Sequence, residues 1–394
     1  MAHVLYLVHD LSDPAVRRRL IMLTRGGATV DLLGFSRAKI PGDIEGIKPV
    51  NLGKTADGRF VQRTWAVLKA MARLRSVLAG LSKPDVIVAR NLEMLALANR
   101  ANGYFGGSVP IVYECLDIHR LLVGMGPVAR SMRFAERWFG RNVSAIVTSS
   151  PAFKSNYFDV LSFLKVPVML VENKVVAVMD DGLLPAPQKR EDRPWRIGWF
   201  GALRCRKSLK LLAHFSRMAN GRFEIILRGR PAYSEFDDFD AFVANEPFMR
   251  FCGPYRNPED LGAIYGEVDF AWTADCFEEG HNSKWLLPNR LYEGCLHGAV
   301  PIAVQGTETA EALRRNNIGL ILSDATSVAL SMAMEGLDVR RFRYLKSAVA
   351  ACDRRNWAID EADCKNLVAW LAGLAPSEPR KTSDHFPISS SFAI

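Results

Sequence analysis

Short apolar runs alternate with amphipathic segments along most of the chain. In the first half, apolar runs predict strands at 3–8, 29–35, 84–89, 109–114, 145–150 and 166–173. Between them, residues 14–24, 63–81 and 130–141 have the spacing of amphipathic helices. Strands that alternate with helices favour a parallel, doubly wound sheet.

This alternation stops at 176–194 and then starts again. The intervening stretch gathers proline and charge, which is typical of a linker. Further strands are expected at 195–201, 223–229, 249–253, 268–273, 299–304 and 318–322. We therefore predict an α/β fold class, with two Rossmann-like, doubly wound domains at 1–175 and 195–374 that face each other across a cleft. Ligands are expected at the carboxyl ends of the strands. The Pro- and Ser-rich tail, 375–394, is predicted to be disordered.

Length and hydropathy agree with this division. The 394 residues are too many for one ordinary core. No apolar run approaches the roughly 18 to 20 residues of a transmembrane helix. Arg17, Arg18 and Arg19 follow the first apolar run instead of preceding it, which is the wrong order for a signal peptide. The sequence therefore predicts a cytoplasmic protein.

The net charge of +9 is uneven, since residues 1–175 hold 24 Lys and Arg against 13 Asp and Glu. Anionic lipid headgroups, a pyrophosphate-bearing substrate and nucleic acid are the partners that such charge suits. The helices at 63–81 and 130–141 mix aromatic residues with cations, which suits the surface of an anionic membrane. Two ordinary packed helices remain the alternative interpretation.

The seven cysteines are scattered and never have C-x-x-C spacing. They indicate neither a disulfide framework nor a zinc site. We expect reduced and mostly structural thiols.

A strand-to-helix junction at 199–212 carries the first chemical signal. Gly201 permits a sharp turn and close backbone approach to a ligand. Arg204, Arg206 and Lys207 gather where the next helix begins, and cations beside helix amides suit a diphosphate. A solvated basic helix face is the alternative.

A second signal is "PNRLYEGCLHGAVPIAV", residues 288–304, a short helix, a turn and a strand. Its Glu293 suits the two hydroxyls of a ribose, by analogy with the acid of dinucleotide folds. Asn289 and Arg290 at the helix start are predicted to help bind the nucleotide. Backbone groups from Gly253 onward are a weaker candidate for contact with the base.

The first half supplies the candidate catalytic residues. The G-x-G-x-x-G motif of NAD and FAD sites is absent after the first strand, where His9 and Asp10 stand instead. Asp117 and His119 follow a later strand. Each of the four is otherwise a structural residue at a strand end.

These segments resemble the GT-B glycosyltransferases, especially glycosyltransferase family 4 and rhizobial-type succinoglycan glycosyltransferases. The family's Gly-x-Leu-x-x-x-Lys turn reads Gly201, Leu203 and Lys207, and its Glu before a Gly-Pro turn reads Glu293. "VYECLDIHR" resembles the family's Asp-x-His segment. One departure is Trp285, where family 4 usually has a first Glu; Asn282 or Glu279 is expected to contact the donor sugar instead.

The resemblance implies transfer of a hexose from a nucleotide sugar, UDP-glucose for preference, to a lipid-diphosphate-linked oligosaccharide. It implies a peripheral inner-membrane enzyme that uses no metal, because the basic cluster neutralises the leaving diphosphate. Asp117 serves as base if the reaction inverts, whereas the leaving phosphate takes the proton if it retains. Three alternatives remain. The first is a GT-B-like sugar-nucleotide epimerase, and the second is a phosphorylase, for which we identify no pyridoxal-phosphate lysine. The third is a nucleic-acid-binding protein, for which no binding motif is present.

Overall fold

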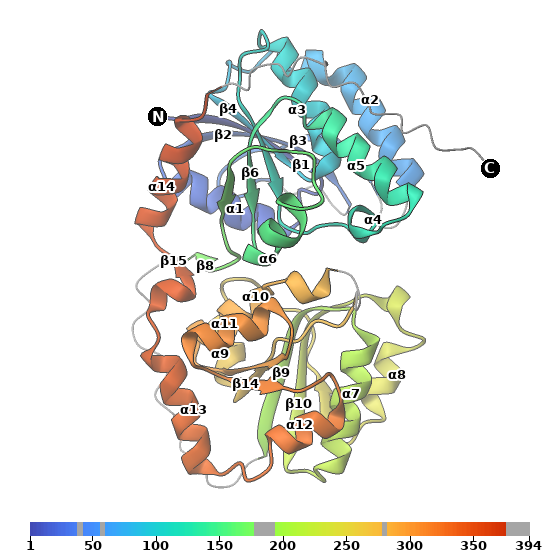
Figure 1. The fold of residues 1–394 in the computed structure, drawn as a ribbon, viewed down its shortest axis with the longest axis vertical. Helices are drawn as coiled ribbons and strands as arrows, with labels where there is room; N and C mark the ends of the chain where they lie inside the picture. The colour runs from blue at the N-terminus through green and yellow to red at the C-terminus, as the bar shows by residue number, and fades with distance from the viewer. Residues whose placement is uncertain (38–41, 56–59, 177–193, 278–281, 376–394) are drawn as a thin grey trace, which may run out of the picture.

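The first half of the chain folds around a seven-stranded parallel sheet (Figure 1). The computed structural model describes residues 1–37, 42–55, 60–176, 194–277 and 282–375. In spatial order the strands are β3 (Val50–Lys54), β2 (Thr29–Ser36), β1 (His3–Val8), β4 (Val86–Arg90), β5 (Ile111–Cys115), β6 (Val143–Thr148) and β7 (Val168–Leu170). All predicted strands of this half are present. The sequence pattern missed β3, a half-exposed edge strand that lacks a continuous apolar run.

Helices cover both faces of this sheet, which explains why its strands are apolar throughout. They are α1 (Pro14–Arg25), α2 (Phe60–Leu78), α3 (Leu92–Tyr104), α4 (Arg120–Val123), α5 (Pro127–Phe139) and α6 (Pro151–Phe153), followed by the π-helical turn η1 (Lys154–Phe158). Successive residues of β1 point to opposite faces. Leu5 and Leu7 belong to the core under α2 and α3, whereas Val4 and Tyr6 belong to the core under α1.

The second half repeats the design with six parallel strands (Figure 1). Their spatial order is β11 (Met249–Phe251), β10 (Phe223–Pro231), β9 (Trp195–Leu203), β12 (Phe270–Trp272), β13 (Val300–Val304) and β14 (Leu320–Leu322). The helices are α7 (Arg206–Met218), α8 (Phe239–Ala244), α9 (Leu261–Gly266), α10 (Asn289–Leu296), α11 (Glu308–Asn316), α12 (Ser327–Ala333) and α13 (Val339–Ala351). Each of the six predicted strands of this half is present.

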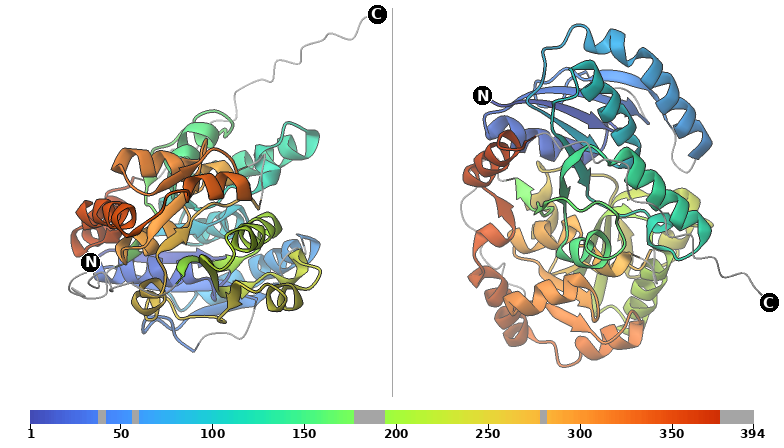
Figure 2. Two further views of the ribbon diagram at one scale, coloured as in Figure 1. Left: turned by 90° about the horizontal axis from the view of Figure 1, so that it is seen from below. Right: turned by 45° about the horizontal axis from the view of Figure 1, so that its top comes forward.

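The last helix, α14 (Glu361–Ala372), returns to the first domain and packs on α1 (Figure 1 and Figure 2). The sequence analysis assigned it to the second domain, and the structure corrects that boundary. Cys364 and Leu367 enter the core beneath α1. Gly26 makes the approach possible, because a Cβ there would lie 2.3 Å from the Cys364 carbonyl oxygen. Burial of the apolar face of α14 against α1 therefore decides its place.

Two short paired strands mark the passage of the chain between the domains. β8 (Val175–Val176) lies parallel to β15 (Ala358–Ile359). Most of the predicted linker, 177–193, and all but the first residue of the predicted tail lie outside the described residues. In the part of the chain that the structure describes, no helix has both the length and the apolar character needed to cross a bilayer.

Helix α5 turns charged side chains toward the protein interior. Arg133 donates to the carbonyls of Leu122 and Gly124 at 2.7 and 2.8 Å. Glu136 is fully buried and accepts from the hydroxyls of Tyr157 and Ser162 at 2.8 and 2.9 Å. Burial raises the pKa of Glu136 to about 7, because the charged carboxylate loses its hydration there.

Glu136 should make stability depend on pH. A carboxyl with a higher pKa in the folded than in the unfolded chain stabilises the fold fully below pH 4.5, and this contribution is lost as pH rises through about 7. Between pH 5 and pH 8 we expect the wild-type unfolding free energy to fall by up to roughly 3 kcal/mol more than that of Glu136→Gln. Urea denaturation of both proteins at three pH values measures the two slopes. Equal slopes would contradict the assignment.

Candidate active site

The strand order of each sheet reverses beside its first strand. β1 lies next to β4 in one sheet and β9 next to β12 in the other. Doubly wound sheets bind ligands outside the carboxyl ends of the strands at this reversal. Residues that follow strands of the first sheet, among them Asp117 after β5, contact residues of the second domain. The candidate site is therefore the region between the two facing sheet edges (Figure 1).

Three glycines with positive φ lie at adjacent strand ends of the second sheet. They are Gly201, Gly229 and Gly253, with φ values of 105°, 130° and 77°. A Cβ on Gly229 would lie 1.9 Å from the Gly201 carbonyl oxygen, and the Gly229 amide donates to the Gly253 carbonyl at 2.9 Å. The backbones touch here, so position 229 has no room for a side chain, and the Tyr255 hydroxyl would lie 3.9 Å from a Cβ on Gly201.

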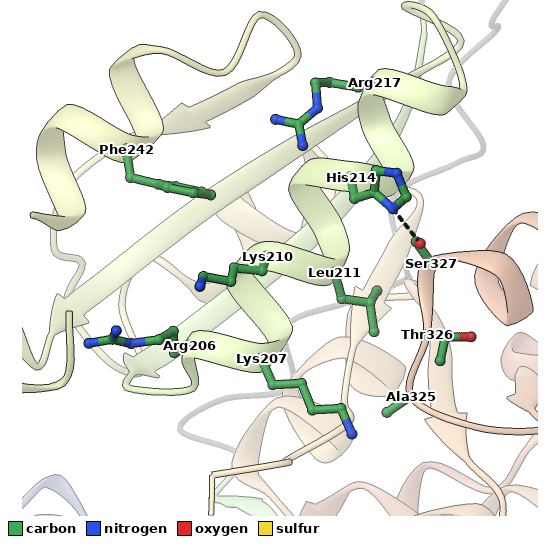
Figure 3. Close-up of a pocket in the computed structure, with 10 residues that line it drawn as sticks. All are labelled: Arg206, Lys207, Lys210, Leu211, His214, Arg217, Phe242, Ala325, Thr326 and Ser327. Carbon is green, nitrogen blue, oxygen red and sulfur yellow. Dashed lines mark hydrogen bonds between the residues drawn. The ribbon is translucent and has the colours of Figure 1, made fainter. Parts of the chain in front are cut away.

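Two side chains of the predicted basic cluster, those of Arg204 and Arg206, point in different directions. Arg204 lies 3.8 Å from the Asp275 carboxylate, and its guanidinium stacks on the Phe277 ring at 4.7 Å. Arg206 instead points away, donating to both carboxylate oxygens of Asp237 at 2.9 and 3.1 Å. Figure 3 shows Arg206 and Lys207 leaving the first turn of α7 in different directions. The structure thus brings Arg204 to the β12 end and turns Arg206 toward the loop before α8.

Glu293 is a buried residue of α10, and each of its carboxylate oxygens accepts one hydrogen bond. It accepts from the Asn257 amide at 2.7 Å and from the Tyr265 hydroxyl at 3.1 Å. Burial raises its pKa. The helix packs closely on the sheet because Gly294 has no side chain, and a Cβ there would lie 2.9 Å from that of Ala271.

Residues at the start of α10 contact both domains. Asn289 accepts from Arg18 of the first domain at 3.4 Å. Arg290 donates to the Ala274 carbonyl at 2.7 Å and lies 3.8 Å from Asp275. Its buried Nε has no hydrogen-bond partner among the described residues. Asp275 therefore lies between two guanidinium groups, those of Arg204 and Arg290.

Asn282 joins the domains at the predicted Asp-x-His segment. It is buried and donates to the Asp117 carboxylate at 3.1 Å and to the Ile118 carbonyl. His119 caps α4, where its Nδ1 accepts from the Leu121 amide at 3.2 Å. Asp117 and His119 are both exposed. The structure therefore brings Asn282 and Asp117 together, as neighbours across the domain boundary.

His9 and Asp10 follow β1 but have different surroundings. Asp10 accepts from the amide and hydroxyl of Ser12, which stabilises the turn into α1. The Nδ1 of His9 is buried and has no hydrogen-bond partner within the described ranges, while its Nε2 lies 4.0 Å from Asp13. Burial, and then the nearby Arg90, lower the pKa of His9. His9 is thus a neutral imidazole at neutral pH.

Arg90 forms the buried base of this region. It donates to the Tyr6 hydroxyl at 3.0 Å and lies 3.3 Å from Asp13 and 3.4 Å from Glu114. Glu114 also accepts from Arg19 at 2.6 Å. All these groups are charged or hydrogen-bonded and largely buried. Removal of one group would therefore leave a buried charge or polar group of its partner uncompensated.

Sequence reasoning missed the contacts of α1 with the second domain. Arg17 donates to the Asn257 carbonyl at 2.8 Å and to Glu259 at 2.9 Å. Arg18 reaches Asn289, as described above. The signal was present as three consecutive arginines, but only the relative position of the domains gives the first two their partners in the second domain.

The departure at Trp285 has a structural explanation. Trp285 packs against the core of the first domain, and its carbonyl accepts from the Ser150 hydroxyl at 2.5 Å. Glu279, the other predicted substitute for the missing Glu, lies outside the described residues.

Among residues that the structure does describe, no cluster of three or more His, Cys, Asp or Glu side chains is placed to hold a metal ion.

Comparison with known proteins confirms the predicted resemblance. Residues 16–174 match the glycosyl transferase 4-like domain. The chain is 54% identical over an alignment of 387 residues to the succinoglycan biosynthesis protein ExoL of Rhizobium meliloti (strain 1021), and the match covers 96% of each chain.

Solved glycosyltransferase structures confirm the fold. Anabaena HepE, in complex with UDP-glucose, has a TM-score of 0.67 at 13% identity, covering 94% of this chain and 99% of that one. The sucrose-phosphate synthase of Thermosynechococcus elongatus has a TM-score of 0.64 at 13% identity and 94% coverage of both chains. The predicted α/β class with two doubly wound domains is the GT-B fold of these neighbours.

The Arg90 network should be strongly stabilising as a unit. Arg90→Ala leaves Glu114 and Asp13 without one cationic partner in a buried site, so we expect a loss of about 3–5 kcal/mol of unfolding free energy. Arg256→Ala is the matched control, because Arg256 is 78% exposed and pairs only locally with Asp260; its loss should stay below about 1 kcal/mol. Urea denaturation measures both, and equal losses would argue against the network.

Proposed function

Because the chain belongs to the glycosyltransferase 4-like family, we propose that it transfers a hexose from a nucleotide sugar to a lipid-diphosphate-linked oligosaccharide. The proposed pathway is the assembly of a succinoglycan-like exopolysaccharide, and the proposed donor is UDP-glucose. Support comes from the relative that matches almost the whole chain and from HepE, which was solved with UDP-glucose. The observation that carries the proposal is the glycine-lined edge of the second sheet, with Arg204 and Arg290 beside it.

We propose that the donor diphosphate lies on the Gly201 turn, where it meets Arg204, Lys207 and Arg290. Charge-assisted hydrogen bonds from these cations would neutralise the leaving diphosphate without a metal ion. For the diphosphate to bind, Arg204 and Arg290 exchange Asp275 for a phosphate oxygen. The loop after β12 therefore has to yield when the donor enters.

The proposed ribose contact is Glu293. Asn257 and Tyr265 use two of the roughly four hydrogen-bonding positions of a carboxylate, which leaves positions for the two ribose hydroxyls. Backbone groups at Gly253 are the proposed contact for the base. Asn289 is proposed to help place the nucleotide at the start of α10.

The proposed catalytic residues come from the first domain. Asp117, held by Asn282, is the base of an inverting reaction. In a retaining reaction the leaving phosphate takes the proton, and His119 positions the sugar. His9 and Asp10, which follow β1, are proposed to face the acceptor.

Transfer by the purified protein tests the function. Labelled UDP-glucose and a panel of other sugar nucleotides are incubated with a membrane extract that contains lipid-linked acceptors. We expect label in the organic-soluble lipid fraction from one donor. A converted sugar nucleotide without lipid product would favour the epimerase alternative, and no product from any donor would refute the proposal.

The affinity of variants for UDP should distinguish the roles of the three residues in the basic cluster. Arg204→Ala should weaken UDP binding about tenfold, because one charge-assisted hydrogen bond to phosphate is lost. Lys207→Ala should have a similar effect. Arg206→Ala is the matched control, since Arg206 is bound to Asp237, and it should change affinity least. Calorimetry with UDP measures all three. The reverse order would place the diphosphate near α8 instead.

The proposed membrane contact is the outer face of α5 and its neighbours. While Arg133 and Glu136 point inward, Phe134 and Trp138 are each 54% exposed. The exposed face of α5 therefore carries two large aromatic residues beside Arg130 and Arg137, while Met132 and Phe139 pack on the core. Further exposed apolar residues nearby are Trp65 and Leu68 of α2, Met125, Val128, Val160 and Phe163.

Cations accompany this apolar surface. Arg141 lies over the ring of Trp138 at 4.9 Å, and Arg137 lies over that of Phe163 at 5.6 Å. Figure 1 and Figure 2 show α2, α4 and α5 on one side of the first domain. Aromatic residues mixed with arginines suit the headgroup region of an anionic membrane, where a lipid-linked acceptor is found.

Vesicle binding tests this surface. Phe134→Ser with Trp138→Ser should reduce binding to vesicles of anionic phospholipid at least tenfold, because each aromatic side chain contributes about 1.5 kcal/mol or more when buried. Tyr344→Ser is the control, since Tyr344 is an exposed aromatic residue of α13 in the second domain. Binding should also fall with salt. Unchanged binding of the double variant would refute the assignment.

A further inference from the structure

A basic pocket lies on the outer face of α7 in the second domain (Figure 3). Its volume is about 770 Å³, and α8 and the start of α12 supply its other walls. One histidine and four cations of α7 line it, namely His214, Arg206, Lys207, Lys210 and Arg217. Successive helix residues point about 100° apart, so these five positions share an arc of about 100°. Among the described residues that line this α7 pocket, none is acidic.

The positive charge of the α7 pocket is accessible to an anion. Arg206 and Arg217 pair with Asp237 and Glu246, but their side chains are 45% and 50% exposed. Such exposed ion pairs are weak, because water and salt screen them. Lys210 has no carboxylate within ion-pair distance in the described part of the chain. A phosphate group can therefore join Lys210 and compete for the two guanidinium groups at little cost.

The α7 pocket also has an aromatic wall, Phe242 of α8, which is partly buried against the core of the second domain. Figure 3 shows this ring on the side of α7 from which three of the cations leave, namely Arg206, Lys210 and Arg217. Cations beside an aromatic ring suit an amphiphile, whose anionic group binds the charges while its apolar part contacts the ring. A small, fully hydrated anion would leave the ring unused.

The α7 pocket lies on the same side of the molecule as the proposed membrane surface of the first domain. In Figure 1, α7 and α8 are on the right of the second domain, and α2, α4 and α5 are on the right of the first. The view from below in Figure 2 keeps these helices of both domains on one side. A bilayer that contacts the exposed aromatic residues of α5 can therefore also reach the α7 pocket.

We propose that the α7 pocket binds the phosphate headgroup of an anionic membrane lipid, so that both domains contact the membrane. Lys210 and Arg217 bind the phosphate with Arg206 beside them, and Phe242 contacts the apolar atoms next to the headgroup. The inference rests on the membrane surface of the proposed function. Binding through α5 raises the effective concentration of lipid at the α7 pocket, so the two contacts strengthen each other.

Vesicle binding by two charge-matched variants tests the α7 pocket. Lys210→Glu reverses an exposed charge in the pocket, whereas Arg343→Glu reverses an exposed charge on α13, on the other side of the second domain (Figure 1). With vesicles of phosphatidylcholine and phosphatidylglycerol, Lys210→Glu should weaken binding roughly 30-fold, since each unit of charge near an anionic surface contributes about fivefold. Arg343→Glu should change it less than about twofold, because salt screens a distant charge. Equal losses would show that net charge alone attracts the protein, and would overturn the proposal.

Amide hydrogen exchange locates the contact and identifies its chemistry. Peptides from 206–217 should exchange more slowly when these vesicles are present, and peptides from 339–351 should not. Glycerol phosphate, which has the phosphate but no acyl chain, should give little protection. If glycerol phosphate protects 206–217 and vesicles do not, the pocket binds a soluble phosphate compound and the lipid assignment is refuted.

UDP calorimetry and the transfer assay separate this inference from the proposed function. Lys210→Glu should bind UDP like the wild type, because Lys210 is not part of the proposed donor site. If vesicle binding depends on Lys210 but no sugar is transferred from any donor, the α7 pocket stands and the proposed function fails. If sugar is transferred and Lys210→Glu binds vesicles like the wild type, the proposed function stands and the α7 pocket is refuted.

Discussion

Three consecutive arginines of α1 connect the core of the first domain to the second domain. Successive residues of a helix point about 100° apart, so each arginine takes a different direction. Arg19 turns inward to the buried Glu114, while Arg17 and Arg18 reach Glu259 and Asn289 in the second domain. Since α1 starts at the carboxyl end of β1, the same helix fixes the turn that carries His9. One short segment therefore contributes both to the contact with the second domain and to the geometry of the first strand end.

Most of the sheet architecture could be predicted because parallel strands covered on both faces are continuous apolar runs. The exceptions lack that signal. β3 alternates exposed and half-buried residues at a sheet edge, and β8 and β15 are two residues each. The return of α14 to α1 was equally hidden, because an apolar helix face shows that a partner exists but not which one. Gly26 gives the reason only once both helices are in place.

The candidate site was predictable where one local segment carries the chemistry. The Gly201 turn and Glu293 are of this kind, and the resemblance to a family named the same residues. The contacts of Asp275 and Arg18 were not predictable, because their partners lie in segments far away along the chain. The cluster of Arg204, Arg206 and Lys207 shows the limit most clearly. The sequence places three cations together, whereas in the structure Arg204 lies beside Asp275 and Arg206 pairs with Asp237.

The contact of Trp285 with the first domain changes how the cleft can be understood. Where family 4 usually has a carboxylate, this chain has an indole that packs on the first domain, next to Asn282, which binds Asp117. The segment from 282 to 286 therefore joins the domains at the point where a donor sugar would be expected. The indole and the amide carry no charge, and the Asp117 carboxylate lies 3.1 Å from the Asn282 amide nitrogen. In the proposed donor site, the nearby charges are those of Asp275 and of its two partners, Arg204 and Arg290.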